Sequence, residues 1–198
     1  FYEVIYSSIS SRLDCFIQKR EFIVLQNLQF DLYTMEILKK IGIGTVQFGM
    51  KYGISNTQGQ TPSEEVSRIL MFARENGIDI IDTAFSYGTS QQVLGKNSLD
   101  GFSLVSKCMP PEDGITIHDQ LTQSLFDLQV SSLYGYLIHQ PVKFLNNPLQ
   151  WDELQNAKEK GLVKKIGFSF NRPSEIEEVL RLGIIPDLVQ IPFNYFDR

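Results

Sequence analysis

The chain has 198 residues and a formal net charge of −5 at pH 7, a length that suits one domain with a substantial core. The mild acidity argues against nucleic acid or an anionic membrane as a partner. No apolar run approaches the roughly 18 residues that a membrane-spanning helix needs. The two cysteines and two histidines show no metal-ligand spacing, so no metal site is expected. So few thiols favour a reducing cytoplasm.

Residues 1–34 do not share the pattern of the rest of the chain. They contain no Gly or Pro and show neither helical nor strand periodicity, whereas Met35 opens a segment that looks like a natural start. We interpret residues 1–34 as an upstream extension or read-through sequence that is not native to the domain. A genuine helical extension is the alternative. Residues 35–198 are then the domain that carries the function.

From Ile41 onward, short apolar segments alternate with amphipathic ones. The β-branched apolar segments predict six buried parallel strands, at 41–48, 78–82, 102–107, 133–139, 163–169 and 187–192. Helices are expected between them, at 62–76, 90–94, 117–129, 150–160 and from Asn171 to a stop at Gly183. The first helix is expected to begin with a capping box, Thr61-Pro62-Ser63-Glu64. The last is expected to turn Ile176, Val179 and Leu180 inward.

This alternation predicts parallel strands joined by right-handed crossovers. An open doubly wound sheet and a (β/α)8 barrel both fit the order of elements. The open sheet normally has a Gly-rich phosphate turn after its first strand, but Gly42 and Gly44 lie inside the first predicted strand. We therefore expect an α/β fold, a (β/α)8 TIM-type barrel that is incomplete, with six of its eight strands present.

Four polar residues fall at or just after the ends of predicted strands: Asp82, Tyr87, Lys107 and His139. In a barrel, active sites gather at this face. A Tyr hydroxyl has a pKa of about 10, which a neighbouring ammonium lowers by stabilising the phenolate. Asp82 would supply the counter-charge of a buried Lys107, and His139 could orient a carbonyl oxygen or share in proton delivery. Such a set protonates an oxygen while the carbonyl carbon receives hydride, which implies a nicotinamide cofactor.

The motifs DTAFSYG, VSK, LIHQP and KKIGFS, in this order, resemble those of the aldo-keto reductase superfamily, and GTVQFGMKYGISN resembles its bacterial members. The resemblance covers about residues 41–198 and implies a (β/α)8 barrel that binds NAD(P)H without a Rossmann fold. It implies Tyr87 as general acid and Lys107 as its pKa-lowering partner. It implies Asp82 as the counter-ion of Lys107, and His139 as the group that orients the carbonyl.

The same resemblance implies cofactor contacts at Gly44, Thr45, Asp82, Ser169 and Gln190. The first two correspond to a GxGT stretch near the nicotinamide ribose, and the last two to positions that hydrogen-bond the nicotinamide carboxamide. The usual Ser-Asn pair is here Ser169-Phe170, followed by Asn171, so the Asn contact is either lost or supplied by Asn171. The family favours NADP, with NAD as the alternative.

Three functional hypotheses follow. The first is a cytoplasmic enzyme that reduces a small-molecule aldehyde or ketone to an alcohol by hydride transfer from NAD(P)H. The second is a barrel that senses nicotinamide redox state and regulates a partner with little turnover. The third is an inactive fragment, because a C-terminally truncated barrel exposes two strand edges. Five loop residues are candidates for an apolar substrate pocket: Phe48, Tyr52, Phe85, Met109 and Phe193.

Overall fold

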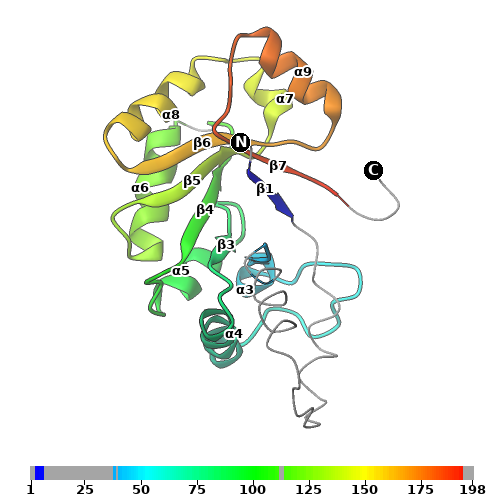
Figure 1. Ribbon diagram of the computed structural model, residues 1–198, viewed down its shortest axis with the longest axis vertical. Helices are drawn as coiled ribbons and strands as arrows, with labels where there is room; N and C mark the ends of the chain where they lie inside the picture. Colours follow the sequence, from blue (N-terminus) through cyan, green and yellow to red (C-terminus); the bar gives the residue numbers. More distant parts are fainter. Residues whose placement is uncertain (1–2, 7–37, 39, 112–113, 194–198) are drawn as a thin grey trace, which may run out of the picture.

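The computed structural model describes residues 3–6, 38, 40–111 and 114–193 (Figure 1). Its strands form one curled sheet in the order β1-β7-β6-β5-β4-β3-β2, and every neighbouring pair is parallel. The helices pack along the outer side of this curl (Figure 1), because each crossover must return the chain to the same end of the sheet. The fold is the incomplete (β/α)8 barrel that the sequence predicts.

The strands are β1 (Glu3–Tyr6), β2 (Gly42–Gly44), β3 (Ile80–Asp82), β4 (Ser103–Cys108), β5 (Leu133–Ile138), β6 (Val163–Ser169) and β7 (Leu188–Ile191). The helices are α3 (Val46–Gly49), α4 (Ser63–Glu75), α5 (Ser90–Gly95), α6 (Ile117–Leu128), α7 (Pro141–Phe144), α8 (Gln150–Glu159) and α9 (Pro173–Arg181). All six predicted strands and all five predicted helices are found. The short helices α3 and α7, and strand β1, were not predicted.

Most of residues 1–34 lies outside the described part of the chain. The exception is β1, which pairs in parallel with β7 at the edge of the sheet. The separation of residues 1–34 from the domain therefore stays a prediction.

The first predicted strand is too long, because β2 ends at Gly44 and α3 occupies residues that were expected to be extended. The amide of Thr45 donates to the carbonyl oxygen of Asp82 at 3.0 Å, and the carbonyl oxygen of Thr45 accepts from the amide of Phe48 at 2.9 Å. The second bond closes a turn. The chain thus leaves the sheet as soon as it has passed the end of β3.

The capping box expected before α4 is wrong. Pro62 is the N-cap residue, and no side chain caps the helix. The amide of Thr61 donates instead to the carbonyl oxygen of Gln47 at 2.8 Å, which ties this residue to α3 one position before the helix begins. Proline has no side-chain oxygen with which to replace the cap.

One of the three residues predicted to face inward on α9 is exposed in the structure. Val179 is buried and Ile176 packs against the core, but Leu180 is 49% exposed. Glu175 faces inward in its place, because its carboxylate accepts hydrogen bonds from the amides of Asn171 and Arg172. This carboxylate caps the start of the helix and sets its rotation about the axis.

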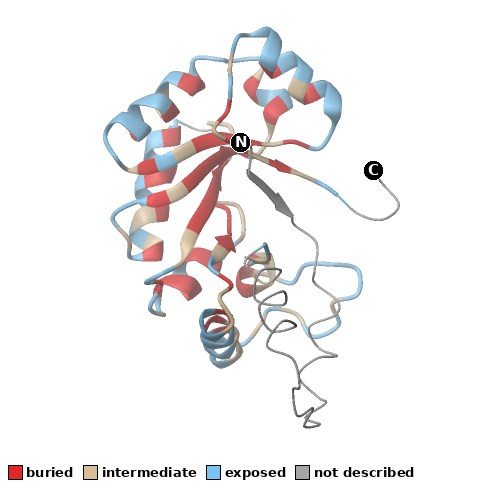
Figure 2. Cartoon of the chain, in the orientation of Figure 1, coloured by how far each residue is buried: buried red, intermediate tan, exposed pale blue. Residues whose placement is uncertain are grey.

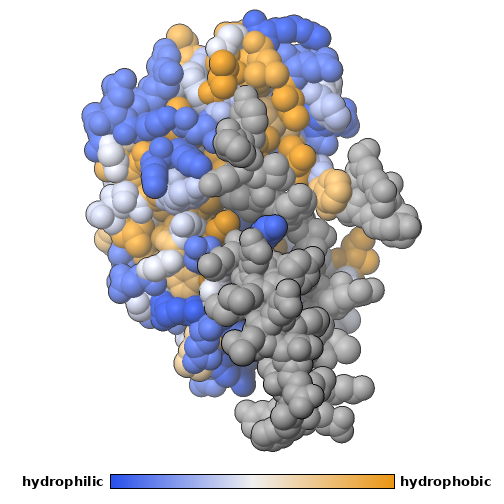
Figure 3. Space-filling view, viewed as in Figure 1, coloured by the Kyte–Doolittle hydropathy of each residue, from blue (hydrophilic) through white to orange (hydrophobic). Residues whose placement is uncertain are grey.

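Buried residues concentrate on the strands and on the sides of the helices that face them (Figure 2). The main core lies between sheet and helices, where an aromatic group of Phe144, Trp151, Phe168 and Phe170 packs with ring centroids 5.1–5.2 Å apart. A second cluster on the inner side of the curl contains Val105, Leu137 and Leu188. Apolar side chains also reach the surface around α9 (Figure 3), including Leu182 and Ile185. No helix of the described part is long and apolar enough to cross a membrane.

Candidate active site

The polar residues of the candidate site form a layer directly above the inner apolar cluster. Successive side chains of a strand alternate between its faces, so residues two apart lie on the same side. Ile80 and the three residues of the inner cluster lie on β3, β4, β5 and β7. The residues two positions after them therefore lie on the same inner side: Asp82, Lys107, His139 and Gln190. The carboxyl ends of the strands thus carry this polar layer, where barrel sites form.

Lys107 is the centre of the layer and is only 1% exposed. Its Nζ donates to Asp82 Oδ1 at 2.6 Å, to the carbonyl oxygen of Thr83 at 3.0 Å and to the hydroxyl of Tyr87 at 3.3 Å. An ammonium has three protons, so each of them has an acceptor. Asp82 is 3% exposed, and the two opposite charges offset each other's burial. The structure thus brings Asp82, Tyr87 and Lys107 into direct contact.

The turn that carries Tyr87 is held between β4 and α3. The amide of Phe85 donates to the carbonyl oxygen of Lys107 at 3.0 Å, so the chain continues along β4 after β3 has ended. A Cβ on Gly49 of α3 would lie 1.8 Å from the carbonyl oxygen of Tyr87. Gly88 has a φ of +57°, and a Cβ there would lie 2.6 Å from the carbonyl oxygen of Gly49. Both positions need glycine for Tyr87 to stand where it does.

Thr45 fixes the main chain of Asp82. Its hydroxyl donates to the carbonyl oxygen of Asp82 at 2.9 Å, and Ser90 lies 2.9 Å from both the hydroxyl and the carbonyl oxygen of Thr45. Thr45 is fully buried, whereas Gly44 is exposed and a Cβ on it would meet no atom within 4 Å. Of the two residues predicted to contact the cofactor here, Gly44 therefore offers an open surface. The hydroxyl of Thr45 is already bonded to Asp82.

His139 follows the end of β5 and lies beside Tyr87. The two rings meet edge to face, with centroids 5.9 Å apart and planes at 76°. The amide of His139 donates to the carbonyl oxygen of Cys108 at 3.0 Å, which extends the pairing of β5 with β4 by one residue. Its Nδ1 lies 3.3 Å from the hydroxyl of Ser86. All four residues predicted to form the tetrad therefore lie in one cluster.

Burial dominates the ionisation of this cluster. It raises the pKa of the Tyr87 phenol, and the negative charge of Asp82 raises it further. It lowers the pKa of Lys107, against the attraction of Asp82 and its hydrogen bond. It also lowers the pKa of His139 from 6.5 to about 4, and the charge of Lys107 acts in the same direction.

The pKa of Tyr87 is therefore raised overall, whereas its pairing with Lys107 led us to expect a lowered value. That Lys107 by itself lowers this pKa stays a prediction. The carboxylate of Asp82, 2.6 Å from Lys107 Nζ, balances the ammonium charge, so the phenol meets a nearly neutral pair while it loses hydration. At neutral pH the structure holds a protonated phenol and a neutral imidazole. Both states suit groups that donate hydrogen bonds to an oxygen.

Ser169 and Gln190 are register partners on β6 and β7. Gln190 is 4% exposed, and its Oε1 is buried with no hydrogen-bond partner among the described residues. An unpaired buried acceptor costs about 1–3 kcal/mol, so an incoming amide N–H at this point would be stabilising. The carboxamide of nicotinamide carries such N–H groups, so this residue fits the predicted contact.

The departure from the family's Ser-Asn pair has a clear structural consequence. Phe170 is 2% exposed and stacks on Phe168 with centroids 5.2 Å apart, so it belongs to the outer core. Asn171 is exposed, and its amide donates to Glu175 at 2.7 Å. Phe170 therefore takes no part in the polar layer. Whether Asn171 supplies the amide contact or the contact is lost stays a prediction.

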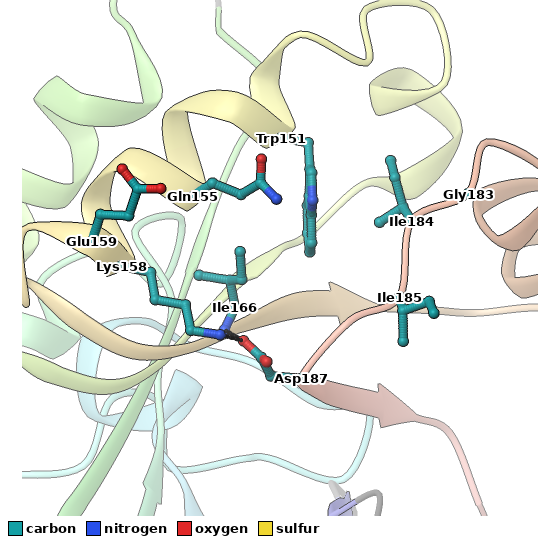
Figure 4. Close-up of a pocket in the computed structure, with 9 residues that line it drawn as sticks. All are labelled: Trp151, Gln155, Lys158, Glu159, Ile166, Gly183, Ile184, Ile185 and Asp187. Atoms are coloured by element: carbon teal, nitrogen blue, oxygen red, sulfur yellow. Dashed lines mark hydrogen bonds and ion pairs between the residues drawn. The ribbon is translucent and has the colours of Figure 1, made fainter.

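The residues proposed for a substrate pocket differ in burial and form three groups. Phe48 is 4% exposed and belongs to the hydrophobic core. Phe85 and Met109 are half-buried, and Tyr52 and Phe193 are exposed. A separate hollow of about 600 Å³ lies on the outer side, between α8 and the segment 183–187 (Figure 4). It contains none of the predicted site residues, and its polar lining includes the ion pair of Lys158 with Asp187.

Sequence reasoning missed two buried glutamines that support β4. Gln120 of α6 binds both main-chain groups of Met109, with Oε1 accepting at 2.8 Å and Nε2 donating at 3.0 Å. Gln91 of α5 donates to the hydroxyl of Ser106 at 2.7 Å. These bonds hold β4 on both sides of Lys107. The available signal was a polar residue at an inward position of an amphipathic helix.

The curled sheet of βα units, with a polar layer at its carboxyl ends, places the chain among the (β/α)8 barrel proteins. The model of the aldo/keto reductase family matches residues 40–198. The chain belongs to this family.

Known relatives align with this chain over only part of their own length. Protein REDOX 2 of Catharanthus roseus is 30% identical over 172 residues, which cover 72% of this chain and 53% of that protein. The NAD/NADP-dependent indole-3-acetaldehyde reductase of Schizosaccharomyces pombe is 29% identical over 157 residues, 72% of this chain and 55% of that protein. This chain therefore spans about half the length of the curated relatives it matches.

Solved structures show the same fold. A Pseudomonas aeruginosa protein assigned to the aldo-keto reductases matches with a TM-score of 0.66 and 26% identity, over 79% of this chain and 64% of that chain. An aldo-keto reductase of Bombyx mori, solved with NADP, matches with a TM-score of 0.58 and 22% identity, over 77% of this chain and 54% of that chain.

Proposed function

We propose that the protein is an NAD(P)H-dependent carbonyl reductase, which converts an aldehyde or ketone to an alcohol with Tyr87 as the general acid. One observation carries this proposal. A buried ammonium is hydrogen-bonded at once to a carboxylate and to a phenol, and an imidazole lies against that phenol. Family membership and the reductase from Schizosaccharomyces pombe, 29% identical, support it.

Each residue of the cluster has a distinct part in the proposed reaction. The protonated phenol of Tyr87 gives its proton to the oxygen that gains charge as the carbonyl carbon is reduced. The ammonium of Lys107 stabilises the phenolate that remains, because it already donates to the Tyr87 hydroxyl at 3.3 Å. Asp82 keeps Lys107 charged in spite of its burial. His139 donates a hydrogen bond to the carbonyl oxygen and orients it.

The residues present fit a nicotinamide cofactor. Gln190 would accept from the carboxamide through its unpaired Oε1, with Ser169 beside it, and the open face of Gly44 would let the cofactor approach the main chain. When bound, this cofactor supplies the hydride that no side chain can supply. The name of the Schizosaccharomyces pombe relative includes both NAD and NADP. We propose NADP as the physiological cofactor, NAD as the alternative, and the cytoplasm as the location.

The proposal is tested with the complete protein. NADPH binding is followed by the change in nicotinamide fluorescence, and turnover by NADPH oxidation across a panel of aldehydes and ketones. Turnover of any member, together with loss of NADPH affinity in Gln190→Leu, is the expected result. Tight NADPH binding without turnover across the panel would exclude a reductase and favour a nicotinamide sensor. Absence of binding of both NADPH and NADH would exclude both.

A further inference from the structure

Ser86 directly precedes Tyr87 in the chain, and its side chain contacts the ring of His139. Its hydroxyl oxygen lies 3.3 Å from Nδ1 of His139, and both side chains are half-buried. Neither Ser86 Oγ nor the ring of His139 has a further hydrogen bond within the part of the chain that the structure describes. The contact therefore pairs two groups that have no other hydrogen-bond partner among the described residues.

The contact bears on which ring nitrogen of His139 carries a proton. The imidazole is neutral at physiological pH, because burial and the charge of Lys107 lower the pKa of His139 to about 4. A neutral imidazole has one N–H donor and one lone pair, and the hydrogen bond at one nitrogen decides the role of the other.

Counting donors and acceptors separates the two tautomers. If Nδ1 carried the proton, it would donate to Ser86 Oγ, and the proton of Ser86 would have no protein acceptor. Nε2 would then present only a lone pair, which repels the lone pairs of a carbonyl oxygen. If Nε2 carries the proton, Ser86 donates to Nδ1 and every group of the contact is used. Nε2–H then remains free to donate.

We propose that Ser86 is a positioning residue, whose hydroxyl donates to Nδ1 of His139 and holds the ring in the tautomer protonated at Nε2. The ring stands edge to face with Tyr87, at 5.9 Å between centroids, so this tautomer lies beside the proposed proton donor. The use of the Nε2 proton on a carbonyl oxygen rests on the proposed function. The tautomer itself does not.

Main-chain bonds hold both partners independently of the serine hydroxyl. The amide of Tyr87 donates to the carbonyl oxygen of Ala84 at 3.1 Å, and that of His139 to the carbonyl oxygen of Cys108 at 3.0 Å. Replacing Ser86 by Ala therefore removes one hydroxyl and leaves the turn intact. Ser86→Thr keeps a hydroxyl on the same carbon and serves as the conservative variant.

The test is direct observation of the tautomer by long-range ¹H–¹⁵N correlation NMR on the protein labelled with ¹⁵N-histidine. Of the two histidines in the sequence, His118 is exposed on α6, and His118→Gln identifies the signals of His139. We expect the His139 proton on Nε2 in the unsubstituted protein, a mixture of both tautomers in Ser86→Ala, and the original pattern in Ser86→Thr. Ser98→Ala is the control, because its hydroxyl bonds the exposed Asp100.

Kinetics of the complete protein give a second readout. Ser86→Ala should lower kcat about ten-fold, well short of the ~10²–10⁴-fold effect of losing an acid–base group. It should change KM by less than about two-fold, since the Nε2–H bond strengthens as charge develops on the oxygen. Ser86→Thr should restore most of kcat, because it keeps the hydroxyl. If Ser86→Ala lowered kcat only by disturbing the local structure, this restoration would not be expected.

The outcomes distinguish this inference from the proposed function. A His139 proton on Nδ1 in the unsubstituted protein overturns the inference, and this spectrum decides even if Ser86→Ala does not fold. An unchanged tautomer in a folded Ser86→Ala also overturns it. A shifted tautomer with unchanged kcat supports the role of Ser86 and counts against the use of His139 in the proposed reaction.

Discussion

Replacing Lys107 by Met tests the energetics of the polar layer. The ammonium is 1% exposed and offsets an Asp82 carboxylate that is 3% exposed. Its removal leaves this carboxylate buried without a cation, which costs about 3–5 kcal/mol. Asp82→Asn is milder, at about 3 kcal/mol, because Lys107 keeps the carbonyl oxygen of Thr83, 3.0 Å from its Nζ, as an acceptor. Either loss is a large part of the total stability of a typical domain, about 5–15 kcal/mol.

The assay is urea unfolding of the complete protein, with the two single variants and the double variant forming a cycle. The double variant should be no less stable than Lys107→Met, because the Asn that remains is uncharged. Lys158→Met is the matched control. Its partner Asp187 lies 2.6 Å away, but the two side chains are 41% and 33% exposed, so less than about 1 kcal/mol should be lost. Additive losses in the cycle, or equal losses for Lys107 and Lys158, would refute the reasoning.

Three further predictions concern the surroundings of this pair. The pKa of His139 is lowered to about 4, so the unfolded chain binds more protons between pH 4 and 6.5. Stability should therefore decrease as the pH is lowered from 6.5 to 4, by up to about 3 kcal/mol more than in His139→Gln, as measured by urea unfolding at each pH. Gln120→Leu leaves two main-chain groups at the end of β4 unpaired and should cost about 1–3 kcal/mol in the same assay, whereas Gln123→Leu on the exposed side of α6 should cost little. Gly49→Ala should lower Tm strongly because its Cβ would overlap main-chain oxygen, while Gly44→Ala, which meets no atom within 4 Å, should leave Tm unchanged and weaken NADPH binding.

The sequence was sufficient to predict the barrel and its polar layer because both follow from strand positions. Short β-branched runs located each strand, and the pleat alone decides on which face of the sheet a residue at the end of a strand lies. Asp82, Lys107 and His139 therefore came together as expected. The predicted and observed strand ends agree at Asp82 of β3 and at Ser169 of β6.

The features that escaped prediction depend on contacts between segments far apart in the chain. Val46–Gly49 has no helical signal of its own, and it becomes α3 because Thr45 bonds to Asp82. The contact of Ser86 with His139 joins residues 53 positions apart. The raised pKa of Tyr87 follows from its burial in the folded structure and from the nearby charge of Asp82, which no motif encodes.

The central claim is that Tyr87, held against Lys107, delivers the proton in carbonyl reduction. The most direct test is kcat for carbonyl-dependent NADPH oxidation by Tyr87→Phe in the complete protein, with the Kd of NADPH measured alongside. We expect kcat to fall about 10²–10⁴-fold with an unchanged Kd, since the phenol lies on the substrate side of the polar layer in this account. Turnover by the Phe variant at the rate of the unsubstituted enzyme would contradict the claim.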